Sequence, residues 1–161
     1  MRKLMLICAL FAFLVPMGMA QSSQVTAKPL TDSDIQLLRS DIRADKQDII
    51  THTMQFTDTE SKAFWPVYRE YANDQDKIGD DRLQLIQDYA KNYDSMDDAK
   101  ADNMGQRMLN IDAKYANLRQ TYWPQFEKAI GAKRAAKFYQ VDSRLTLMIN
   151  LQLASAIPLI P

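Results

Sequence analysis

The stretches FWPVY at residues 64–68 and YWPQF at residues 122–126 share one pattern, aromatic–Trp–Pro–any–aromatic. Each proline lies inside a segment of helical hydrophobic periodicity, where it removes a backbone hydrogen bond and is expected to kink the helix. Ser95 lies midway between Pro66 and Pro124. A helical hairpin that folds back at Ser95 therefore places both kinks at one level and gives a curved, cradle-like antiparallel pair.

Apolar residues recur at helical spacing on both sides of these stretches. One stripe covers residues 64–93, and a second covers residues 104–129 in steps of four and three, as in a coiled-coil seam. Similar spacing predicts a first helix over 31–54 and a last helix over 133–154. Because no segment alternates polar and apolar residues with a period of two, the predicted fold is all-α with four helices.

Capping residues mark two of the predicted helix starts. Thr57, with Glu60 three residues later, forms a capping box, and Phe56 precedes it as a hydrophobic approach to the helix. Ser95 with Asp98 forms a weaker box ahead of the next helix. The long hairpin is thus predicted to begin after Thr57 and to resume after Ser95.

The start of the chain has the features of a secretory signal peptide, residues 1–20. Its apolar run over 4–15 is too short to span a bilayer, and Gly18 and Ala20 supply the small residues that a signal peptidase requires. We therefore expect cleavage after Ala20, a periplasmic location and no stable membrane span. The predicted remainder is a flexible leader over 21–30, a single helical domain over 31–157 and a C-terminal tail over 158–161.

The composition disfavours an enzyme and a nucleic-acid-binding protein. Basic and acidic side chains both number 20, which gives no electrostatic footprint for nucleic acid. Cys8, the single cysteine, lies in the signal peptide, and His52 is the single histidine. The sequence therefore has too few cysteines and histidines to form disulfides, thiol-based sites, histidine-based metal sites or serine–histidine triads. Met104 and Met108 belong to the apolar seam, so we expect no metal and no cofactor.

Both tryptophans lie about 100° around their helices from the main stripes, so each needs a second partner. That partner is either another helix of this chain, which makes them core aromatics, or a molecule outside it. Basic residues follow Trp123 and form either a solvated helix start or part of a binding surface. The candidate surface for client or partner proteins consists of Trp65, Trp123, Lys128, Lys133, Arg134 and Lys137.

The export signal, the curved helical hairpin and the turn at residue 57 resemble the Spy/CpxP-like periplasmic proteins. That family carries a Leu-Thr-x-x-Gln (LTxxQ) motif at the start of long helices. Here Thr57 matches the threonine, while Phe56 replaces leucine and Glu60 replaces glutamine. A poorer second copy begins at Met96 and keeps only the apolar first position.

The resemblance implies a non-enzymatic interaction protein, chaperone-like or an adaptor in the envelope stress response. Such a protein binds exposed segments of unfolded or partner proteins on a concave helical surface. The alternatives are a metal- or ligand-responsive sensor domain of the same fold, or a secreted helical protein with another role. The predicted last helix is apolar nearly all round, which favours a homodimer through this C-terminal helix.

Overall fold

A computed structural model describes residues 44–160 of the chain. The predicted signal peptide, the leader and the start of the first predicted helix at Thr31 lie outside these residues. The described part is all-helical and holds no strand, which confirms the predicted fold class. Its elements are a helical segment over 44–54, α2 (Asp58–Asn92), the short 3-10 helix η1 (Tyr93–Ser95), α3 (Asp98–Ile130) and α4 (Ala132–Ala156).

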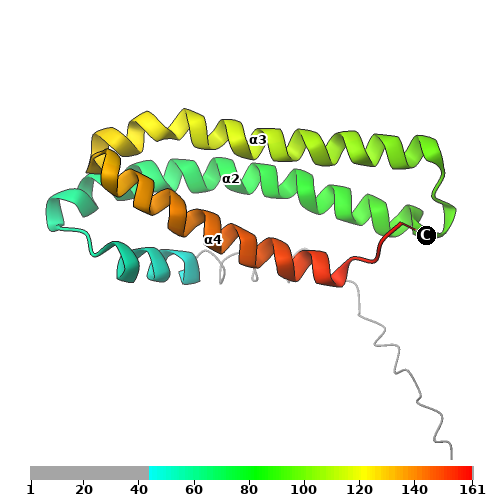
Figure 1. Ribbon diagram of the computed structural model, residues 1–161, viewed down its shortest axis with the longest axis horizontal. Coiled ribbons are helices and arrows are strands. Elements are labelled where there is room, and N and C mark those ends of the chain that lie inside the picture. Colours follow the sequence, from blue (N-terminus) through cyan, green and yellow to red (C-terminus); the bar gives the residue numbers. More distant parts are fainter. Residues whose placement is uncertain (1–43, 161) are drawn as a thin grey trace, which may run out of the picture.

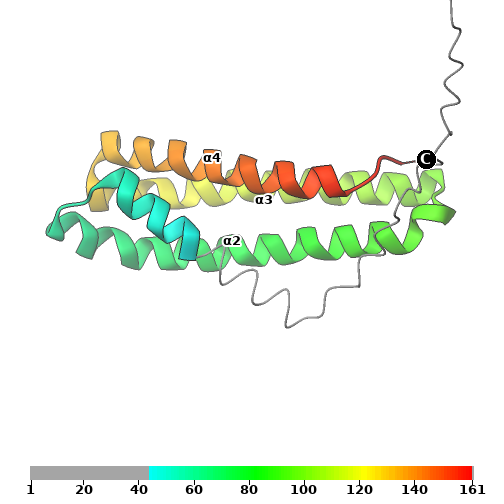
Figure 2. The same cartoon turned by 90° about the horizontal axis from the view of Figure 1, so that it is seen from below.

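The long helices α2 and α3 lie side by side and run antiparallel, joined at η1 (Figure 1). We call the end at η1 the tip and the opposite end, where α3 meets α4, the base. α4 begins at the base and crosses the pair toward the tip, and the 44–54 segment lies beside α2 at the base (Figure 2). Phe64 of α2 meets Phe126 of α3 with ring centroids 5.4 Å apart, so Pro66 and Pro124 stand at one level.

Both helices continue past their prolines. A proline inside a helix leaves the carbonyl four residues earlier without its usual partner, here those of Lys62 and Gln120. Pro66, Pro124 and these two residues are all exposed, so the carbonyls lie where water can reach them. The outward position of both prolines explains why neither one ends its helix.

The two predicted caps have different outcomes. The capping box at α2 is present: the amide of Thr57 donates to Glu60 Oε2 over 2.9 Å, and the amide of Glu60 donates to Thr57 Oγ1 over 3.3 Å. The predicted cap at Ser95 is wrong. Ser95 belongs to η1, which extends the end of α2, and the side chain of Asp97 instead caps α3 by accepting from the amide of Lys100 over 2.8 Å.

The hydrophobic core lies at the base. Its buried apolar side chains fall within residues 64–78 of α2, 111–130 of α3 and 135–145 of α4, together with Ile50 and Met54 of the 44–54 segment. The three rings at its centre, with centroids 4.6 to 5.4 Å apart, belong to Phe64, Phe126 and Phe138. Among the described residues, no apolar side chain is buried nearer the tip than Ile78, Ile111 and Leu145. The bundle is therefore well packed at the base and has few buried side chains toward the tip.

Gly131 separates α3 from α4 with φ 78° and ψ 152°, a conformation that side chains other than glycine rarely adopt. We expect Gly131→Ala to lower the free energy of unfolding by about 2 kcal/mol through backbone strain alone, because an added Cβ would meet nothing within 4 Å. Urea unfolding followed by circular dichroism measures the change.

Gly105→Ala is the matched control, since this helical glycine in α3 also has open space around an added Cβ. There alanine should raise the free energy of unfolding by about 0.5–1 kcal/mol, because it removes backbone freedom from the unfolded chain. Equal shifts in the same direction at both positions would contradict the role assigned to Gly131.

Candidate functional site

The two tryptophans of the predicted surface are half-buried and have different neighbours. Trp65 lies edge-on to Phe56 and Tyr68, with ring centroids 6.2 and 5.3 Å apart. Trp123 stacks on Tyr139 of α4 at 5.7 Å. Both pack against the core at the base, as the packing alternative predicted, and each keeps part of its ring exposed.

The basic cluster of the predicted surface divides into two parts. Arg134 pairs with Glu60 at 2.8 Å and donates to the carbonyl of Met54 over 2.8 Å, and Lys137 donates to the carbonyl of Thr53 over 2.7 Å. These carbonyls end the 44–54 segment, so both cations satisfy acceptors that a helix end leaves open. Arg134 and Lys137 therefore join the first helix to α4.

Lys128 and Lys133 are the other part of that cluster, and both are exposed. The predicted surface thus supplies two exposed lysines, two half-buried tryptophans and two cations with partners inside the chain. Hydrogen bonds from the backbone of Thr57 hold the pKa of Glu60 below its ordinary value, and the charge of Arg134 adds to the effect. The capping box and the Arg134 side chain beside it together connect the start of α2 to α4 at the base.

A fully buried carboxylate, that of Asp142 in α4, connects four helical segments. The hydroxyl of Tyr71 in α2 donates to its Oδ2 over 2.7 Å. Lys46 Nζ of the 44–54 segment lies 3.5 Å from Oδ1, and Arg119 Nη2 of α3 lies 3.7 Å from Oδ2. Lys46 also donates to Gln75 Oε1 over 2.6 Å. The cluster fixes how the four segments sit against one another.

The tyrosines around this carboxylate are held protonated. Burial and then the charge of Asp142 raise the pKa of Tyr71 far above its ordinary value. Burial also raises the pKa of Tyr139 to about 12, and Asp142 contributes. The hydroxyls therefore remain donors across the physiological range. Because Asp142 is closed off from solvent, we assign the cluster to the architecture of the bundle and not to binding.

Sequence reasoning missed this cluster, although a signal was present. Asp142 lies four residues after Phe138 and three before Leu145, so it occupies the inner stripe of α4. A single carboxylate on an otherwise apolar stripe is a signal for a buried partner, because an unpaired buried charge is costly.

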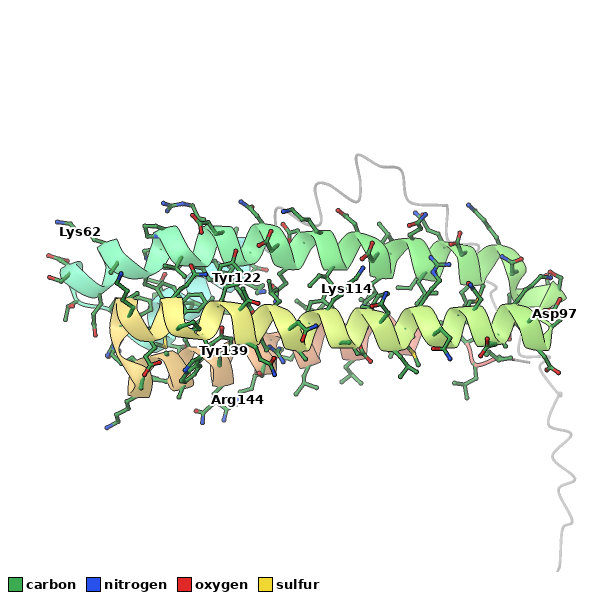
Figure 3. All side chains as sticks on the ribbon, turned by 90° about the horizontal axis from the view of Figure 1, so that it is seen from above. Lys62, Asp97, Lys114, Tyr122, Tyr139 and Arg144 are labelled. Carbon is green, nitrogen blue, oxygen red and sulfur yellow. The ribbon has the colours of Figure 1, made fainter. Side chains whose placement is uncertain are left out.

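Toward the tip, ion pairs join α2 and α3 in addition to partly buried apolar side chains such as Leu85 and Tyr115. Such pairs between partly exposed side chains contribute little stability, about 0–1 kcal/mol each. Figure 3 shows one of them at Lys114, which lies between the two helices. The pairs are Lys114 with Asp81 at 2.7 Å, Arg82 with Asp112 at 3.0 Å, and Arg107 with Asp88 at 2.9 Å.

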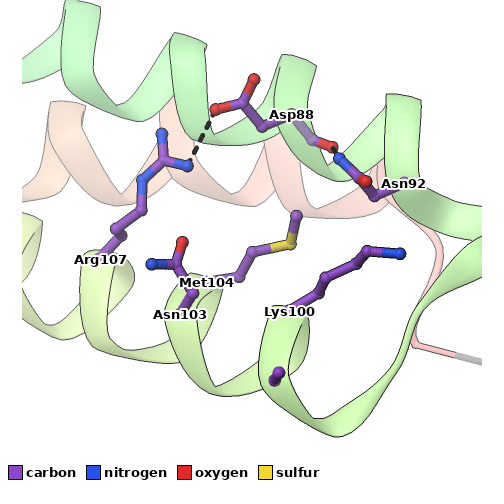
Figure 4. Close-up of a pocket in the computed structure, with 7 residues that line it drawn as sticks. Asp88, Asn92, Lys100, Asn103, Met104 and Arg107 are labelled. Carbon is purple, nitrogen blue, oxygen red and sulfur yellow. Dashed lines mark hydrogen bonds and ion pairs between the residues drawn. The ribbon is translucent and has the colours of Figure 1, made fainter.

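A cleft of about 320 Å³ lies between α2 and α3 near the tip (Figure 4). Arg107 and Asp88 form an ion pair across it, and Asn92 donates to the carbonyl of Asp88 over 2.8 Å. Met104 reaches into the same cleft from α3. Besides this ion pair, the cleft offers a ligand amide groups, one thioether and the ammonium group of Lys100.

Large apolar side chains are exposed on the tip half of the molecule. Three of them follow one another on the outer side of α4, where Leu147, Met148 and Leu151 have exposed fractions of 67%, 66% and 72%. Exposed apolar side chains in one region are a common mark of a protein-binding site. We use the name tip surface for all the exposed apolar side chains of this half, which lie on more than one side of α4: Met108, Leu109, Leu147, Met148, Leu151, Leu153, Leu159 and Ile160.

No family model, curated protein or solved structure matched this chain. Within residues 44–160, every helix falls short of the long apolar stretch that a bilayer crossing requires. In the same part of the chain, no three His, Cys, Asp or Glu residues stand together as a metal-binding group would. The resemblance to Spy/CpxP-like proteins therefore stays a prediction from the sequence.

Proposed function

We propose that this protein is a non-enzymatic interaction protein of the periplasm that binds exposed apolar segments of unfolded or partner proteins. In this proposal it is exported through residues 1–20 and acts without nucleotide, as a chaperone-like protein or an adaptor in the envelope stress response. The observation that carries the proposal is the tip surface, which presents apolar side chains from α3, α4 and the C-terminal tail.

The chemistry of the tip surface suits partners of varied sequence. Leu and Met supply most of it, and the flexible, polarisable side chains of Met108 and Met148 adapt to different apolar contacts. The surface also lies away from the base, so its occupation leaves the core aromatics undisturbed. A binding site of this kind needs no rearrangement of the packed end of the bundle.

The exposed lysines add a second element to the proposal. Lys128 and Lys133 lie near the junction of α3 and α4, where positive charge can speed the first encounter with acidic segments of a client. Half-exposed Trp123 stands on the same helix as Lys128. In this proposal the base contributes to capture, and the tip surface holds the apolar segment.

Suppression of client aggregation tests the proposal. The protein, at amounts near stoichiometric with a heat-unfolded client enzyme, should reduce light scattering in the absence of nucleotide. Leu147→Lys should lower the affinity for the client by about 1–2 kcal/mol, roughly tenfold, because it places a charge on the tip surface. Suppression of aggregation should weaken accordingly. No suppression by the unchanged protein at several-fold excess would exclude the chaperone-like function.

Gln140→Lys is the matched control for this experiment. It adds the same charge to α4 at another exposed position, two turns nearer the base and outside the tip surface. We expect this variant to suppress aggregation as well as the unchanged protein. Equal losses in both variants would point to a general effect of charge and would remove the tip surface from the proposal.

A further inference from the structure

The cleft between α2 and α3 near the tip has an ion pair at one end. Arg107 Nη1 donates to Asp88 Oδ2 over 2.9 Å, and the two side chains have exposed fractions of 33% and 34%. A guanidinium group has five N–H donors and a carboxylate has two oxygens, so this hydrogen bond leaves both groups able to bind a second charged partner. The pair can therefore hold a ligand without being broken.

A free α-amino acid has the two charges that complement this pair. Its carboxylate accepts paired hydrogen bonds from a guanidinium group, and its ammonium group donates to a carboxylate. Both of these groups are attached to the same carbon atom, so they lie as close together as the charged ends of Arg107 and Asp88. In a dipeptide the two terminal charges lie about 3.5 Å further apart. The ion pair therefore favours a free amino acid over a peptide.

The other end of the cleft has one positive charge, that of Lys100. Its Nζ donates to the carbonyl of Ser95 over 2.6 Å and to Ser95 Oγ over 3.3 Å, and Asp97 Oδ2 lies 3.5 Å away. Because an ammonium group has three donors, one is left for Asp97 or for a ligand. The residues that line the cleft carry two positive charges and one negative charge. The lining therefore favours a ligand with a net negative charge.

Between its two ends, the cleft suits a short aliphatic chain. Met104 is half-buried and lies between Arg107 and Lys100 (Figure 4), where its flexible thioether can pack against methylene groups. Asn92 and Asn103 add amide groups from α2 and α3. The volume of about 320 Å³ is at the lower end of the range for small-molecule sites. The space therefore fits a single amino acid with an unbranched side chain.

We propose that this cleft binds a free acidic α-amino acid, with glutamate as the best-fitting probe. The α-carboxylate binds Arg107, the ammonium group binds Asp88, and the side-chain carboxylate reaches toward Lys100. Two turns of α3, about 10 Å, separate the two cations along the helix. Two hydrogen bonds of about 2.8 Å leave about 5 Å, which the four carbon–carbon bonds between the carboxylates of glutamate can span.

This inference goes beyond the proposed function, because the residues that line the cleft do not belong to the tip surface. It assigns a small ligand to the face between α2 and α3, whereas the proposed function concerns protein segments on the tip surface. Failure of either one leaves the other standing.

Titration of the unchanged protein with L-glutamate, followed by nuclear magnetic resonance, tests the site. The amide signals of residues 99–107 should shift saturably with a dissociation constant of about 1 mM, since the lining groups stay partly exposed to water. Glutarate lacks the ammonium group and L-lysine reverses the side-chain charge, so each should bind at least about tenfold more weakly. Equal binding of the three, or no saturable shift by L-glutamate up to about 20 mM, would overturn the proposal.

Variants at the ion pair separate binding from the stability of the hairpin. Arg107→Gln and Asp88→Asn should each weaken L-glutamate binding at least about tenfold. The matched control is Lys114→Gln, which also removes a partly exposed ion pair between α2 and α3, with Asp81 at 2.7 Å, but lies outside the cleft lining. It should bind L-glutamate as the unchanged protein does, and far-ultraviolet circular dichroism shows that each variant is folded.

Lys100→Gln tests the other end of the cleft. The unchanged protein should bind L-glutamate at least about threefold more tightly than L-glutamine, and Lys100→Gln should remove this preference because it removes the charge that distinguishes the two side chains. Binding that survives Arg107→Gln, or equal losses in Arg107→Gln and Lys114→Gln, would show that the cleft is not the site. A preference that persists in Lys100→Gln would overturn the assigned orientation and with it the choice of an acidic ligand.

Discussion

Asp142→Asn is expected to lower the free energy of unfolding by about 3 kcal/mol, the range for removing one partner of a buried ion pair. Asparagine fills the same space and can still accept from the Tyr71 hydroxyl, so the loss comes from charge and not from a cavity. It leaves Lys46, whose side chain is 12% exposed, and Arg119 without the carboxylate that balances them. Urea unfolding at pH 7 measures the change.

Asp112→Asn is the control for this result. Asp112 also pairs with an arginine, Arg82 at 3.0 Å, but its side chain is 62% exposed. Water replaces the lost partner there, so we expect a change below about 1 kcal/mol. Similar losses in the two variants would show that burial of Asp142 does not set the energetics of its cluster.

The double variant Lys46→Met with Asp142→Asn separates pairing from other effects. In Asp142→Asn, the charge of Lys46 is left without the carboxylate and lowers the free energy of unfolding. If this is the cause of the loss, removal of that charge recovers part of the free energy of unfolding, and the effects of the two changes are non-additive. Additive losses would mean that the 44–54 segment is held by Ile50 and Met54 and not by the ion pair.

Local patterns predicted the elements of this fold well. The capping box at Thr57 depends on residues close in sequence, and the structure places it where the sequence indicated. The predicted last helix over 133–154 corresponds to α4 within two residues at each end. The cap of α3 was misplaced because Ser95 and Asp97 are both good capping residues, and the choice depends on how far η1 extends α2.

Contacts between distant segments could not be predicted in the same way. Arg134 and Lys137 appeared as a basic patch at a helix start, but their partners are the carbonyls that end another helix. The Asp142 cluster draws on residues from four segments, which no local period brings together. Which cation meets which acceptor depends on how the helices cross.

Periodicity also shows which side of a helix is apolar, but not whether another helix covers it. Met108 and Phe126 belong to the same seam of α3, with steps of four and three between them. Phe126 is fully buried, whereas Met108 is 51% exposed. Only the paths of the neighbouring helices decide this difference, and so the tip surface was not predicted from the sequence.

Phe126→Ala is expected to lower the free energy of unfolding by about 4 kcal/mol, through lost apolar burial and the cavity that remains. The ring has no exposed area and meets aromatic rings from α2, α3 and α4. Its neighbours, with centroids 4.6 to 6.4 Å away, are Phe64, Tyr71, Tyr122, Phe138 and Tyr139. Urea unfolding, with near-ultraviolet circular dichroism for aromatic packing, measures the loss.

Leu109→Ala on the same helix is the control, and it should change the free energy of unfolding by less than about 0.5 kcal/mol because Leu109 is 60% exposed. Phe126→Leu, which keeps most of the apolar volume, should fall between the two. A loss at Leu109 comparable to that at Phe126 would mean that the tip is packed in solution. The base could then no longer be distinguished, as the well-packed end that contributes most of the stability, from a tip whose exposed side chains are available for binding.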